Sequence, residues 1–104
     1  METMNDYCTH RLLIAGSKPE LKQFERKADW TDIPGATDTA LLDRSPGRVV
    51  WEFVTKSPAL PAVRTLSRRW PQLTFFLHYD CEDCRLTGLV RAKNGRLLQH
   101  RFKY

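Results

Sequence analysis

The segment from residue 48 to residue 55, RVVWEFVT, constrains the fold most, because β-branched and aromatic residues dominate it. In a strand, successive side chains point to opposite faces. Val49, Trp51 and Phe53 would therefore share one face, with the even-numbered residues on the other. We expect this segment to be a strand of a sheet.

Four further segments are predicted as strands, at residues 7–15, 73–79, 86–92 and 97–102, the last running on toward 104. Two helices separate them. Ser17 is the expected N-cap of the first, which should end near residue 28. Ser57 is the expected N-cap of the second, with Pro58 at its first position. Asn94 and Gly95 predict a tight hairpin turn between the last two strands.

The segment 29–47 is rich in Asp, Thr, Pro and Gly, and we predict a long loop there with a short helical turn at TALLD. Trp30 and Ile33 are the side chains expected to attach this loop to the body of the domain.

Each predicted helix carries a single apolar stripe, which two helices cannot bury against one another alone. The sequence therefore predicts one α+β domain over residues 1–104, in two layers. An antiparallel or mixed sheet of four to five strands would have two helices packed on one face. The other face would be open to solvent or to a partner.

Charge is spread unevenly along the chain, which has a net charge of +5. Residues 1–43 contain 5 basic and 8 acidic side chains, whereas residues 44–104 contain 12 basic and 4 acidic ones. Such asymmetry is found in proteins that bind nucleic acid and, more often, in solvated arginine-rich surfaces. Charge alone leaves both interpretations open.

The chain contains no apolar run long enough for a membrane span, and its first residues do not resemble a signal peptide. We therefore expect a cytoplasmic protein without membrane contact. An odd number of cysteines, three, also favours a reducing compartment in which all are thiols.

Several structural motifs resemble the phage Api-type family, small ferredoxin-like domains of bacteria, plasmids and phages. The resemblance covers about two thirds of the chain in pieces and gives no catalytic residues. It is carried by Leu12, Ile14, Gly16, Thr55, Ser57-Pro58, Leu66-Ser67, Trp70-Pro71, Leu73, Phe75, Tyr79 and Gly88. It implies a ferredoxin-like sandwich, in agreement with the layer argument, and an accessory protein of phage or plasmid type.

The motif HYDCEDCR at residues 78–85 has the C-x-x-C spacing of a zinc knuckle. Cys81 and Cys84 would be one ligand pair, and Cys8 with His10 the candidate second pair for zinc, the one candidate cofactor. The alternative is a hairpin tip with reduced cysteines, and we expect that the second pair does not reach it. Three acidic neighbours disfavour a reactive thiolate there, which argues against a redox role.

No nucleophile elbow, zincin motif or phosphate-binding loop occurs, which favours a non-enzymatic role. A small interaction module that binds a protein partner, or itself as a homodimer, through the open sheet face is the leading prediction. The alternative is a basic nucleic-acid-binding domain that uses Phe76, His78, Arg91 and Arg101 on that face.

Overall fold

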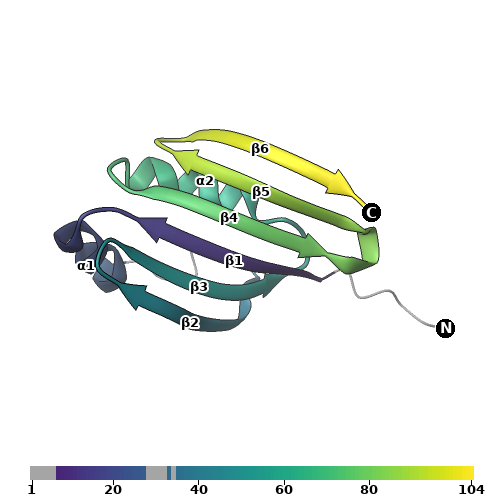
Figure 1. Cartoon of the computed structure of the whole chain (residues 1–104), viewed down its shortest axis with the longest axis horizontal. Helices are drawn as coiled ribbons and strands as arrows, with labels where there is room; N and C mark the ends of the chain where they lie inside the picture. The colour runs from purple at the N-terminus through teal and green to yellow at the C-terminus, as the bar shows by residue number, and fades with distance from the viewer. Residues whose placement is uncertain (1–6, 28–32, 34) are drawn as a thin grey trace.

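The computed structural model describes residues 7–27, 33 and 35–104, of which Figure 1 shows the arrangement. The described residues contain two helices, a short 3₁₀ helix and six strands. Their bounds are β1 Cys8–Ala15, α1 Lys18–Lys27, β2 Thr37–Ser45, β3 Arg48–Thr55, α2 Leu60–Arg69, β4 Thr74–Cys81, η2 Glu82–Cys84, β5 Leu86–Lys93 and β6 Arg96–Lys103.

All six strands form one sheet in the order β2-β3-β1-β4-β5-β6, and every neighbouring pair is antiparallel. The first strand of the chain thus lies in the middle of the sheet, between β3 and β4 (Figure 1). The prediction of a ferredoxin-like sandwich with four to five strands is wrong, because the sheet has six strands. The strand that was not predicted is β2, at one edge of the sheet. At the opposite edge, β5 and β6 continue the sheet beyond β4.

The strand β2 occupies the segment for which we predicted a loop with a helical turn at TALLD. Eight of its nine residues are exposed, so no face of it is buried and no alternating pattern marks it in the sequence. The segment is a strand because it pairs with β3, and this long-range contact cannot be recognised from the local sequence. Ile33 is buried, as predicted, whereas Trp30 lies outside the described residues.

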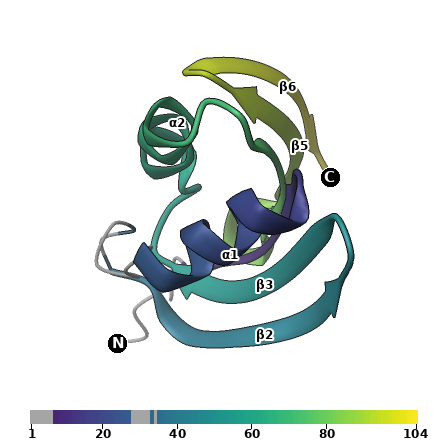
Figure 2. The same cartoon turned by 90° about the vertical axis from the view of Figure 1, so that its left-hand side faces the viewer.

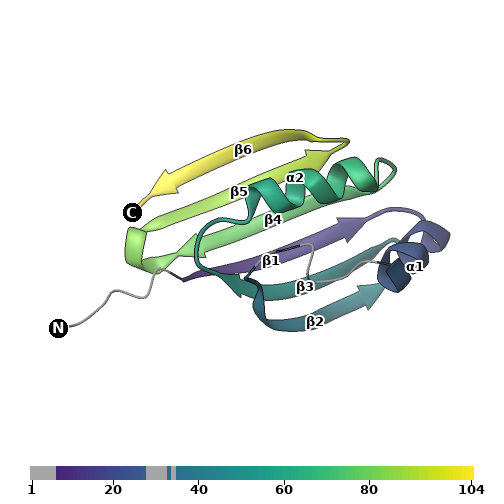
Figure 3. The same cartoon turned by 180° about the vertical axis from the view of Figure 1, so that it is seen from behind.

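Both helices lie on the same side of the sheet, seen in front of it in Figure 3. The end-on view in Figure 2 shows the sheet curving around them. Leu21 and Phe24 bury the stripe of α1, and Val63 and Leu66 bury that of α2. Phe24 forms edge contacts with Trp70 and Phe75, at ring-centroid distances of 5.3 and 5.9 Å. In the described part of the chain, no helix is long and apolar enough to cross a membrane.

The two helix starts differ from one another in how they are fixed. The Ser17 hydroxyl accepts a hydrogen bond from the Glu20 N–H at 3.4 Å, so Ser17 caps α1 as predicted. The predicted cap Ser57 of the second helix is wrong, because α2 begins at Leu60 and its N-cap is Ala59. The Ala59 N–H donates to His10 Nε2 on β1, at 3.0 Å. A contact from the sheet therefore sets where α2 begins.

One row of side chains crosses the helix-covered face at the centre of the sheet. His10 lies opposite Phe53 on β3 and opposite Tyr79 on β4. Its ring stacks on Phe53 with centroids 4.8 Å apart. Tyr79 continues over Gly88 of β5, where a Cβ atom would lie 2.2 Å from the tyrosine ring. The lack of a side chain at Gly88 thus lets Tyr79 pack flat and donate its hydroxyl to Gln99 Oε1 on β6, at 3.3 Å.

Candidate functional site

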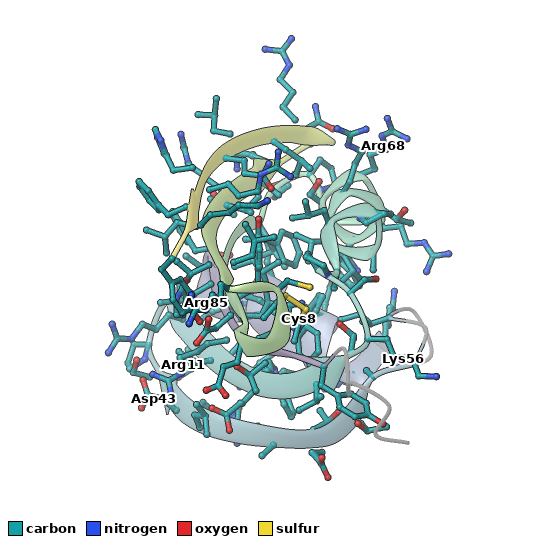
Figure 4. All side chains as sticks on the ribbon, turned by 90° about the vertical axis from the view of Figure 1, so that its right-hand side faces the viewer. Cys8, Arg11, Asp43, Lys56, Arg68 and Arg85 are labelled. Carbon is teal, nitrogen blue, oxygen red and sulfur yellow. A yellow bond between two sulfur atoms is a disulfide. The ribbon has the colours of Figure 1, made fainter. Side chains whose placement is uncertain are left out.

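The sheet face opposite the helices is the candidate site, because no described element of the chain covers it. Figure 4 shows Arg11 and Asp43 on the side of the sheet away from α2. The strand registers align the side chains of this face in rows. One row contains Asp43, Val50, Leu13, Phe76, Arg91 and Leu98, and the next contains Ala40, Glu52, Arg11, His78, Leu89 and His100.

Five residues form an apolar patch on this face: Leu13, Val50, Phe76, Leu89 and Leu98. They line one shallow groove that crosses β3, β1, β4, β5 and β6. Phe76, Leu89 and Leu98 are 41, 56 and 64% exposed, and Phe102 near them is 59% exposed. A contiguous group of exposed apolar side chains on one face is a candidate binding surface.

Three acidic side chains on the described part of this face have partners within the chain. Glu52 forms an ion pair with Arg11 at 3.3 Å, and Asp43 with Arg48 at 3.4 Å. The Asp80 carboxylate accepts a hydrogen bond of 2.6 Å from the Tyr104 hydroxyl.

On β5 and β6, three cationic side chains beside the apolar patch have no acidic partner among the described residues. Among the described residues, Arg91, Lys93 and Arg96, here called the cationic group, make no ion pair. Lys93 only approaches the Thr74 hydroxyl, at 3.5 Å. The β4–β6 side of the open face is therefore apolar and positively charged together.

Three of the four residues predicted to contact nucleic acid lie together on this face. Phe76 is directly opposite Arg91, and His78 is opposite Leu89. His78 Nε2 is 3.2 Å from the Thr87 hydroxyl. Arg101 does not belong to this group, since it lies opposite Gly88 and shares the helix side of β6 with Gln99. Strand alternation separates it from Phe76.

The cysteines differ from the prediction. Cys8 and Cys81 form a disulfide, with Cα atoms 4.2 Å apart, and only Cys84 is a free, exposed thiol. The expectation of three reduced cysteines is therefore wrong, as is the expectation that Cys8 stays away from the CEDC segment. The register explains the contact: Thr9 lies opposite Asp80, so the next residues, Cys8 and Cys81, face each other across β1 and β4. Figure 4 shows the sulfur–sulfur bond at Cys8, beside the turn that carries Arg85.

The predicted zinc ligands do not form a tetrahedral set. Two of the four are joined in the disulfide and cannot act as thiolates, and His10 Nε2 accepts the Ala59 N–H. Within residues 7–27, 33 and 35–104, no group of three or more His, Cys, Asp or Glu side chains converges in a way that could hold a metal ion.

His10 is a buried structural side chain. Burial lowers its pKa from 6.5 to about 4, against the opposing effect of the carbonyl groups of Cys8 and Phe53. The ring is therefore neutral at pH 7, so Nε2 can accept the hydrogen bond that fixes the start of α2.

Four members of the apolar patch were not predicted from the sequence: Leu13, Val50, Leu89 and Leu98. A signal for them was present: the alternation of Leu89 and Arg91 against Val90 and Ala92 marks two faces of β5. It could be used only once the register between β4, β5 and β6 was known.

No family model matches the chain, and neither a curated protein nor a solved structure matches it. The resemblance to the phage Api-type family accordingly stays a prediction, and the open face is interpreted from its own geometry.

The disulfide between Cys8 and Cys81 is expected to stabilise the fold. Replacing Cys8 and Cys81 together by alanine removes a cross-link between residues 73 positions apart. We expect the free energy of unfolding to fall by about 2 to 5 kcal/mol, because such a link limits the unfolded chain. Urea denaturation measures it. Cys84→Ala is the matched control and should change stability little; equal stability of the double variant and the wild type would contradict the cross-link.

The lowered pKa of His10 predicts that the stability of the fold depends on pH. Between pH 6.5 and 4 the unfolded chain binds a proton at His10 that the folded chain does not bind. The free energy of unfolding should therefore decrease by about 3 kcal/mol as the pH falls through this window. His10→Gln keeps an acceptor for the Ala59 N–H but cannot titrate. Its unfolding curves should lack this part of the pH dependence, and parallel pH profiles for both proteins would argue against a neutral buried ring.

Proposed function

We propose that the chain is a small non-enzymatic interaction module that binds a protein partner through the open face of its sheet. The observation that carries this proposal is the apolar patch next to the cationic group. Leu89 and Leu98 are more than half exposed, and Arg91 lies between Phe76 and Leu98 in the same row.

The chemistry of the face indicates the partner. Protein interfaces combine a well-packed apolar centre, often with arginine and aromatic residues, with a polar rim. Phe76 and Arg91 are residues of this kind. A partner with an apolar centre and carboxylates at its rim would complement the patch and the cationic group, because the acids of the open face already have partners within the chain.

A role as an accessory protein of phage or plasmid type agrees with this proposal, since such a protein would act by binding. The cytoplasmic location stays a prediction. The disulfide between Cys8 and Cys81 counts against it, because stable disulfides are uncommon in reducing compartments.

A second candidate function is binding of single-stranded nucleic acid on the same face. The direct opposition of Phe76 and Arg91, with His78 in the next row, favours it. Bases stack on exposed aromatic rings, and arginine contacts the backbone phosphates. The aliphatic side chains of Leu89 and Leu98 add nothing to such a contact, which is why a protein partner is preferred.

The substitution Leu89→Asp tests the proposal, because it puts a charge into the apolar patch at an exposed position. Leu42→Asp on β2 is the matched control, since Leu42 is 45% exposed and lies on the far edge strand. A protein retained from cell extract by the wild-type chain is purified, and its Kd for all three chains is measured by calorimetry. We expect Leu89→Asp to weaken binding at least about tenfold, equal to about 1.4 kcal/mol, and Leu42→Asp to bind as the wild type does.

Equal binding by Leu89→Asp and the wild-type chain would refute a partner on the open face. The second candidate is tested with a short fluorescent oligouridylate at low and high salt. Salt-sensitive binding that Phe76→Ala and Arg91→Ala weaken, and that Leu89→Asp leaves intact, would replace the protein partner by nucleic acid. Absence of binding at low salt would eliminate the nucleic-acid alternative.

A further inference from the structure

The two edges of the sheet differ in their ability to accept another strand. At one edge, the pairing of β2 with β3 contains two register shifts, and Asp38 has a positive φ of 52°. Such irregularities protect an edge from pairing with another chain. At the other edge, β6 pairs with β5 in continuous register from Arg96 to Lys103. It presents a regular, uncovered strand of 8 residues.

The backbone groups of β6 that point outward can be identified. The Tyr104 N–H donates to the Arg85 carbonyl at 2.7 Å, so Tyr104 directs its backbone toward β5. Backbone direction alternates along an antiparallel strand. The even-numbered residues of β6 therefore bond to β5, and the odd-numbered ones direct their N–H and carbonyl groups away from the sheet. The outward residues are Leu97, Gln99, Arg101 and Lys103.

These outward groups restrict how a second copy of β6 could pair with the first. In an antiparallel pair, each outward residue must face an outward residue of the other copy, so the two residue numbers must sum to an even number. The residue on the two-fold axis faces its own copy, so its number is half of this sum. Sums of 198, 200 and 202 therefore put Gln99, His100 and Arg101, respectively, on the axis. A sum of 202 would put two Arg101 side chains opposite each other, which like charge disfavours.

Among these three registers, the one with His100 on the axis brings the best-matched side chains opposite each other. Leu98 of each copy would lie opposite Phe102 of the other, both exposed in the monomer. The odd-numbered side chains would pair Gln99 with Arg101 and Leu97 with Lys103, so each cation would face a neutral side chain. With Gln99 on the axis instead, Leu98 would face His100 and the apolar match would be lost.

We propose that this edge binds a second copy of the chain, β6 against β6 in antiparallel orientation, with His100 on the two-fold axis. About eight backbone hydrogen bonds would form, and the two six-stranded sheets would become one continuous sheet. The axis is perpendicular to the sheet, so both open faces lie on the same side of the dimer. The new pairing involves only Leu98 of each apolar patch and leaves the rest of the patch uncovered, so this inference does not depend on the proposed protein partner.

Register-specific cross-linking tests the dimer. Cys84→Ser removes the free thiol, and His100→Cys, Gln99→Cys or Arg101→Cys is added to that background. Directly opposed residues that are not hydrogen-bonded approach closely enough for a disulfide, whereas residues two positions out of register do not. Mild oxidation and a non-reducing gel should show a covalent dimer for His100→Cys far more rapidly than for the other two. Faster linkage of Gln99→Cys or Arg101→Cys would overturn the register.

Two further variants separate edge pairing from other modes of association, with the mass in solution of the full chain as the readout. Arg101→Pro removes an outward N–H while leaving the hydrogen bonds to β5 intact, so the fold should persist and the dimer should be lost. Leu89→Asp should keep the dimer, because Leu89 lies on β5 and takes no part in the pairing of the two β6 strands. A dimer that survives Arg101→Pro and is lost in Leu89→Asp would overturn the proposal, as would a wild-type chain that stays monomeric at high concentration.

Discussion

The structure depends on the central position of β1 and on one row of side chains that crosses it. His10 stacks on Phe53 of the strand on one side and lies opposite Tyr79 of the strand on the other. Its Nε2 also accepts the N–H that begins α2, so one neutral imidazole connects three strands and a helix. Burial lowers the pKa of His10 to about 4, so the ring stays neutral well below pH 7. A charged ring there could accept no hydrogen bond and would be costly to bury.

This row also determines what the other face presents. Side chains alternate along a strand, so the register that directs His10, Phe53 and Tyr79 toward the helices directs their neighbours away from them. Val50, Leu13, Phe76, Leu89 and Leu98 thereby become neighbours on an open surface, although they come from five strands. The candidate site is thus a consequence of the register of the core rather than of any short motif.

The predictions from the sequence succeeded where local patterns are strong. The strand β3, the cap Ser17 and the turn at Asn94 and Gly95 depend on nearby residues, and each was recognised. The strand β2 was taken for a loop, because its exposed residues carry no alternating pattern and only its pairing with β3 makes it a strand. The disulfide was missed for a similar reason: Cys8 and Cys81 meet through a register between β1 and β4 that sequence spacing does not contain. For the candidate site, strand alternation was enough to put Phe76 and His78 on the open face, whereas the positions of Arg91 and Arg101 required the registers of β4, β5 and β6. Whether these residues bind a ligand stays a prediction.

The central claim is that the chain has one face closed by helices and one face left open. Methyl relaxation by a soluble paramagnetic agent, measured by NMR at low protein concentration, tests it most directly. We expect strong broadening for the methyl groups of Leu89 and Leu98, and protection for those of Leu12 and Leu77, which are buried. Protection of Leu89 and Leu98 in the isolated chain would contradict it, because the face assigned to binding would then be covered or turned inward.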